Sequence, residues 1–84
     1  MSRTVAVLGA AAARRALGEL DGFDEIVVLE PSVDALEELM HELRDPRLDY
    51  LLGELPVLPL PDASVDVLVG ADAADPEAQR VLRL

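Results

Sequence analysis

Short apolar runs alternate with amphipathic segments along the whole 84-residue chain, and this alternation restricts the possible folds more than any other feature. Apolar runs of about five residues bounded by Gly or Pro are typical of buried parallel strands, whereas apolar residues repeated every three or four positions are typical of helices. The sequence predicts these elements in order: strand 4–8, helix 10–20, strand 26–29, helix 32–45, strand 48–52, loop 54–64, strand 65–69 and a helix from 76 to the C-terminus.

Local signals mark the ends of the later helices. Ser32 can cap the second helix by accepting a backbone N–H from its first turn, and Pro46 stops that helix because proline cannot continue the hydrogen-bond ladder. Asp75, Pro76 and Glu77 form a strong helix start, with a capping acid and proline at the first helical position. The predicted buried stripe of the second helix consists of Val33, Leu36, Leu39, Met40 and Leu43.

This order of elements is typical of a doubly wound α/β fold. Right-handed crossovers place helices on both faces of a parallel sheet, which gives a small three-layer, Rossmann-like domain. By analogy with the Rossmann arrangement, the four strands are expected in the order 3-2-1-4. We expect residues 1–84 to form a single domain with a thin core, because a chain of this size buries only roughly 60–65% of its unfolded surface.

The charge and composition exclude several function classes. The chain carries 17 acidic side chains against seven basic ones, a formal net charge of −10 that opposes binding to nucleic acid. It contains no cysteine, and its aspartates match no cation-binding loop, so no metal site is predicted. No apolar run reaches the roughly 18 residues that a membrane span needs. We therefore expect an acidic cytoplasmic protein that binds neither nucleic acid nor membranes.

The segment from Gly53 to Val69 resembles a stretch of class I S-adenosylmethionine (SAM) dependent methyltransferases, which runs from the end of the third strand into the fourth. In that family the stretch usually reads Gly-Asp, Leu-Pro-Phe-Pro-Asp, a small pair, Phe-Asp and an apolar strand. Here Gly53-Glu54, Leu58-Pro59-Leu60-Pro61-Asp62 and Val65-Asp66-Val67-Leu68-Val69 stand at the matching places without a gap. The resemblance covers nearly the whole chain, but only the N-terminal half of the family's domain.

The fold and the resemblance together indicate a ligand crevice beyond the carboxyl ends of the strands. Gly9 ends the first strand and allows close backbone approach, and Glu30 ends the second strand, where an acid can accept both ribose hydroxyls of a nucleotide. The resemblance implies that Glu54 hydrogen-bonds the adenine amino group and that Leu55 lies against the ring. The candidate cofactor-binding residues are Gly9, Ala11, Glu30, Pro31, Glu54 and Leu55.

The glycine-rich motif is degenerate. The family's motif resembles acid-x-Gly-x-Gly-x-Gly, whereas this chain has Val7 in place of the acid and Ala11 and Ala13 in place of the second and third glycines. Each alanine adds a Cβ where backbone and cofactor nearly touch, and one such methyl costs about 1–3 kcal/mol. The dinucleotide pattern Gly-x-Gly-x-x-Gly is also broken, because Arg14 occupies its third glycine.

Three functional hypotheses follow, and no catalytic residue is identified. The chain is a methyltransferase-like module that binds SAM or S-adenosylhomocysteine without catalysing transfer alone, a ligand-free oligomeric scaffold with the same fold, or a binder of another adenine nucleotide such as NAD. The predicted strand Val65–Val69 would stand at a sheet edge with unpaired N–H and C=O groups, which proteins seldom leave bare. We therefore expect a homodimer, a higher homo-oligomer or a complementing protein to pair with this strand.

Overall fold

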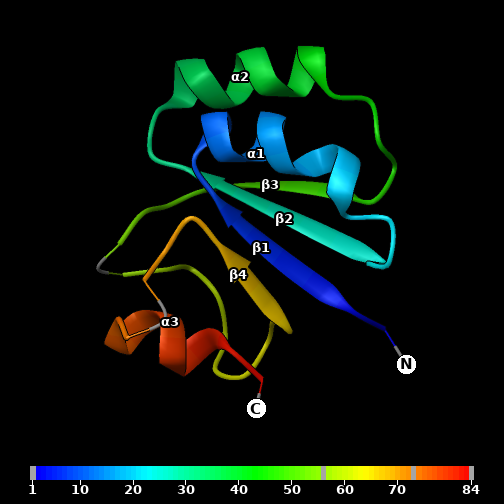
Figure 1. Cartoon of the computed structure of the whole chain (residues 1–84). Coiled ribbons are helices and arrows are strands. Elements are labelled where there is room, and N and C mark those ends of the chain that lie inside the picture. Colours follow the sequence, from blue (N-terminus) through cyan, green and yellow to red (C-terminus); the bar gives the residue numbers. More distant parts are fainter. Residues whose placement is uncertain (1, 56, 73, 84) are drawn as a thin grey trace.

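The computed structural model of the chain describes residues 2–55, 57–72 and 74–83; Pro56 of the predicted loop and Leu84 of the predicted last helix lie outside these ranges. It confirms the predicted parallel sheet in the order β3-β2-β1-β4 (Figure 1). The strands are β1 at Thr4–Leu8, β2 at Glu25–Glu30, β3 at Leu48–Leu52 and β4 at Val67–Val69.

Helices cover both faces of the sheet, as predicted (Figure 1). One face carries α1 at Ala10–Ala16, which continues as the short 3-10 helix η1 at Leu17–Glu19, and α2 at Val33–Glu42. The opposite face carries α3 at Pro76–Val81. None of the helices in the described ranges is long and apolar enough to cross a membrane.

The core consists of two clusters, one on each face of the sheet. Alternate residues of the central strands enter opposite clusters, as the two-residue period of a strand requires. On the side of α1 and α2 the cluster includes Val5, Val7, Ile26, Val28 and Leu39. On the side of α3 it includes Ala6, Val27, Leu29, Leu58, Val65 and Val81.

The predicted buried stripe of α2 is wider than the one the structure shows. Leu36 and Leu39 are buried, but Val33 and Met40 are 51% and 49% exposed, so the prediction is wrong for these two residues. The helix packs against α1, β2 and β3, and β3 is the edge strand, so no described element lies beyond it to cover the outer flank of α2. The predicted cap is confirmed, because the Ser32 hydroxyl accepts a hydrogen bond from the Ala35 N–H at 3.3 Å.

The predicted bare edge at Val65–Val69 also needs correction. Val65 is 1% exposed and precedes β4, where it forms an isolated parallel bridge with Leu82. Its N–H donates to the Val81 carbonyl at 3.0 Å, and its carbonyl accepts from the Arg83 N–H at 2.7 Å. The last helix ends at Val81. Val81 and Arg83 then pair with the backbone of Val65, at the start of the sheet edge that was predicted to need another chain.

Candidate ligand site at the carboxyl ends of the strands

The parallel register places the carboxyl ends of the first three strands side by side at one end of the sheet. Leu8 pairs with Leu29, and Glu30 pairs with Leu52. The residues that follow continue this alignment, since the Gly9 N–H donates to the Leu29 carbonyl at 2.8 Å and the Gly53 N–H donates to the Glu30 carbonyl at 3.3 Å. The candidate residues after β1, β2 and β3 therefore lie along the same edge.

Glu30 joins three elements at this edge. One carboxylate oxygen accepts a hydrogen bond from the Ala10 N–H at 3.2 Å, and the other accepts one from the Ser32 N–H at 2.7 Å. Both donors stand at helix starts, where backbone N–H groups have no partner within the helix. The carboxylate thus connects the end of β2 to the beginnings of α1 and α2, and each of its oxygens keeps a second lone pair for a ligand.

The loop between β1 and α1 is open toward solvent above Gly9. Gly9 has a φ of 95°, a left-handed conformation that other residues rarely adopt, and a Cβ placed on it would meet nothing within 4 Å. Ala11 follows in the first turn of α1 and is exposed. Ala13 is instead buried in the core cluster beneath α1. The prediction that its methyl group crowds a ligand is therefore wrong, whereas crowding by the exposed Ala11 methyl group stays a prediction.

The third strand contributes a tight turn. The Val57 N–H donates to the Glu54 carbonyl at 3.2 Å, and the Glu54 side chain is exposed. Leu55 is half-buried and packs against the same apolar cluster as Leu8, the last residue of β1. Pro31, after β2, is exposed. Backbone and side-chain hydrogen bonds therefore connect the loop after β1 to the end of β2 through Gly9, Ala10 and Glu30, whereas Glu54 is exposed.

Sequence reasoning missed two side chains of α3 that hold the loop after β3. The Glu77 carboxylate accepts a hydrogen bond from the Leu58 N–H at 2.6 Å, and the Arg80 guanidinium donates to the Leu58 carbonyl at 3.0 Å. Glu77 and Arg80 also pair with each other at 2.6 Å. Their i,i+3 spacing signals that ion pair in the sequence, but nothing in the sequence signals that both would bind Leu58.

Within the described ranges, no pocket is enclosed and no three His, Asp or Glu side chains gather as a metal-binding set. The predicted candidate site is thus an open edge of the sheet, lined by the loops after β1, β2 and β3. These loops offer a ligand the half-buried carboxylate of Glu30, the exposed carboxylate of Glu54, the apolar side chain of Leu55 and the accessible backbone of Gly9.

Solved structures share this architecture, and 24 chains match it significantly. One is from a Haloferax volcanii complex between the Trm112 methyltransferase activator and a protein described as a methyltransferase. It has 29% identity and a TM-score of 0.67 over 80% of this chain and 30% of that one. The chain has a class I methyltransferase-like fold. No protein-family model matches the sequence, and the curated proteins include no significant match.

Two further methyltransferase-like neighbours cover more of the chain. A protein of Anaeromyxobacter dehalogenans, described as a type II methyltransferase, has 28% identity and a TM-score of 0.68 over 96% of this chain and 37% of its own. A SAM-dependent methyltransferase of Aquifex aeolicus has a TM-score of 0.70 over 96% of this chain and 51% of its own, but its 20% identity supports only the fold. The chain spans between 30% and 51% of the length of these three neighbours.

Proposed function

We propose that residues 1–84 form a methyltransferase-like domain that binds SAM or S-adenosylhomocysteine and does not transfer methyl groups by itself. The observation that carries this proposal is the Glu30 carboxylate at the end of β2. It is held in place by the N–H groups of Ala10 and Ser32 and keeps one acceptor lone pair on each oxygen. A carboxylate held in this way can accept the two hydroxyls of a ribose.

The remaining candidate residues fit the adenosine part of SAM better than its amino acid part. Leu55 offers an apolar surface beside the loop, and the exposed Glu54 can accept a hydrogen bond from an adenine amino group. By contrast, Val7 stands at the family's acidic position and is fully buried in the core, so it offers no group to a ligand. The methyl group of Ala11 costs about 1–3 kcal/mol if it crowds the ligand, which weakens binding by about tenfold or more.

Methyl transfer requires SAM and its acceptor to be held in line. SAM, when bound, supplies the methyl group, and this chain supplies the carboxylate and the backbone that orient the adenosine part. In the resembling family the acceptor pocket comes largely from the half of the fold after strand four. For this reason we propose ligand binding, without turnover, for the chain studied alone.

Calorimetry with S-adenosylhomocysteine tests the proposal. We expect measurable binding at 1 mM ligand, and we expect the Glu30→Ala variant to lose it because the ribose hydroxyls lose their acceptor. Glu25→Ala is the matched control, since Glu25 is an exposed acid at the opposite end of the same strand. Circular dichroism must show that both variants are folded. A wild-type chain that gives no heat at 1 mM contradicts the proposal, and competition with AMP or NAD identifies a preference for another adenine nucleotide.

A second function, that of an oligomeric interaction module, is favoured by the outer side of β4. The N–H and C=O groups of a strand residue point to the same side and alternate between sides along the strand. Val65 directs both groups outward to the C-terminal segment, while the Asp66 N–H points inward to the Thr4 carbonyl. Val67 and Val69 therefore direct theirs outward, and among the described residues nothing is paired with them. We propose that a second copy or a complementing protein pairs there.

Light scattering at micromolar concentration tests self-association through this edge. We expect a mass near twice the 9.0 kDa of one chain. Val67→Pro removes the outward N–H and is expected to give a monomer, because proline cannot donate to an added strand. Val67→Thr keeps the N–H and the branched shape, so it is expected to remain dimeric. A monomeric wild-type chain with ordinary solubility contradicts self-association and leaves a complementing protein as the remaining partner.

A further inference from the structure

The loop after β3 is fastened to α3 through both backbone groups of one buried residue. Leu58 is 2% exposed and lies outside any strand, so its N–H and C=O groups need partners other than a strand ladder. The Glu77 carboxylate accepts from the N–H at 2.6 Å, and the Arg80 guanidinium donates to the carbonyl at 3.0 Å. We call this pair of side chains the α3 clamp.

The α3 clamp reaches a second point of the same loop. Arg80 also donates to the Asp62 carboxylate at 2.7 Å, so a single guanidinium binds Leu58, Asp62 and Glu77 at once. Pro59, the residue after Leu58, packs so closely against Gly53 that a Cβ on Gly53 would lie 2.6 Å from the Pro59 Cδ. The middle of the loop is therefore held both against Gly53, just after β3, and against α3.

Charge keeps the α3 clamp in its bonded form over a wide pH range. The hydrogen bonds from Arg80 and from the Leu58 N–H lower the pKa of Glu77 to about 2. A lowered pKa in the folded state means that the ionised carboxylate stabilises the fold. This contribution is complete above the ordinary pKa near 4.5 and is lost as the pH falls toward 2. At neutral pH the loop is consequently held by a charged pair.

We propose that Glu77 and Arg80 are positioning residues for the candidate ligand site. They lie on α3, on the face of the sheet opposite α1 and α2, but the loop that they hold carries Glu54 and Leu55 at the end of β3. Holding the loop before a ligand arrives lowers the ordering cost of binding. The proposal rests on the proposed binding of SAM or S-adenosylhomocysteine, and it assigns the role to two residues that need not touch the ligand.

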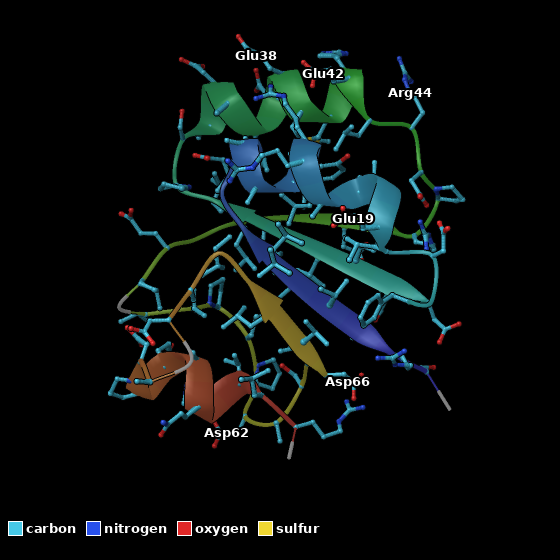
Figure 2. The ribbon with its side chains drawn as sticks, viewed as in Figure 1. Glu19, Glu38, Glu42, Arg44, Asp62 and Asp66 are labelled. Carbon is cyan, nitrogen blue, oxygen red and sulfur yellow. The ribbon has the colours of Figure 1, made fainter. Side chains whose placement is uncertain are left out.

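Hydrogen exchange in the ligand-free chain tests the first step. In Arg80→Met the apolar stem is kept and the guanidinium is lost. We expect the hydrogen-bonded amides of Val57 and Leu58 to exchange about tenfold faster or more, because hydrogen bonds to a charged group are removed. The amides of β1 and β2 are expected to be unchanged. Arg44→Met is the control: Arg44 is exposed, and Figure 2 shows it on the opposite side of the molecule from Asp62.

A conservative variant separates charge from hydrogen bonding. Glu77→Gln keeps an acceptor for the Leu58 N–H but loses the charge that pairs with Arg80, so its loop amides are expected to exchange at rates between those of the wild-type chain and those of Glu77→Ala. Equal exchange in all three chains would show that the α3 clamp does not hold the loop, and this result overturns the proposal whatever the ligand binding.

Calorimetry with S-adenosylhomocysteine tests the second step. We expect Arg80→Met to bind about tenfold more weakly, whereas Leu39→Ala, which is destabilised on the other face of the sheet, should keep the wild-type affinity as long as it is folded. Faster loop exchange with unchanged affinity in Arg80→Met overturns the positioning role and leaves the proposed function intact. No binding to the wild-type chain overturns the proposed function and the positioning role together, and the exchange rates then show whether the α3 clamp itself is correct.

Discussion

Replacing Gly70 by alanine is expected to lower the free energy of unfolding by about 3 kcal/mol or more, from two independent causes. Gly70 follows β4 with a φ of 91°, where a side chain strains the backbone. A Cβ at this position would also lie 2.7 Å from the Leu8 carbonyl oxygen, which is backbone and cannot swing away. Because Leu8 ends β1, relief of this contact has to separate the two strands at their carboxyl ends.

Urea unfolding followed by circular dichroism measures this effect. Gly18→Ala is the matched control, because Gly18 lies in η1 without a positive φ and an added Cβ would meet nothing within 4 Å. That control is expected to be neutral or to stabilise by about 0.5–1 kcal/mol, since alanine restricts the unfolded chain more than glycine does. Equal midpoints for the two variants would show that β1 and β4 do not approach each other as closely as described.

A second large effect is expected from two neighbouring residues of α2. Leu39 is fully buried in the core cluster, and Leu39→Ala is expected to cost about 2–5 kcal/mol through lost apolar contact and the cavity left behind. Met40, the next residue, is half-exposed, and Met40→Ala is expected to change the free energy of unfolding by less than about 0.5 kcal/mol. For a domain of this size the first loss is a large part of the total stability, which is typically about 5–15 kcal/mol.

The comparison is sharp because both substitutions are made on the same helix and differ by one position. Both variants change helix propensity in the same direction, since alanine favours helices slightly more than either residue. Thermal and urea unfolding should therefore separate them by burial alone. Equal destabilisation by the two substitutions would mean that the outer flank of α2 is covered in solution.

The central strands were predictable from sequence because their environment is uniform. β1 and β2 are buried on both faces, so every residue in their middle is apolar, and a continuous apolar run is a direct signal of that position. The strand order followed from general rules for parallel sheets, supported by the family resemblance. These features depend on short stretches of chain and on connections that have few alternatives.

Other features could not be predicted because they depend on what lies beyond an element. The apolar period of α2 marks Leu39 and Met40 equally, and only the absence of a described element beyond β3 distinguishes them. The bridge between Val65 and Leu82 and the bond between Leu58 and Glu77 join residues 17 and 19 positions apart (82 − 65 and 77 − 58). No local sequence pattern encodes such pairs, so the pairing of Val65 with the C-terminal segment and the α3 clamp were found only in the structure.

The candidate site was predictable in part. Glu30 was identified from its place at the end of a strand, and the structure places it beside the loop after β1, as that reasoning requires. The sequence did not predict that the carboxylate would bind the N–H groups of Ala10 and Ser32, because that depends on how two helices start around it.

The direction in which the chain leaves α3 has a practical consequence for experiments. Leu82 forms a parallel bridge with Val65, so the chain after α3 runs in the same direction as β4. A polypeptide fused after the C-terminal residues would therefore continue along the outer flank of β4. A purification tag at that end can itself add to the sheet and either block or imitate an association. A tag before Thr4 precedes β1, which lies on the other side of β4 from that flank, so measurements of assembly are cleanest with tags at the N-terminus.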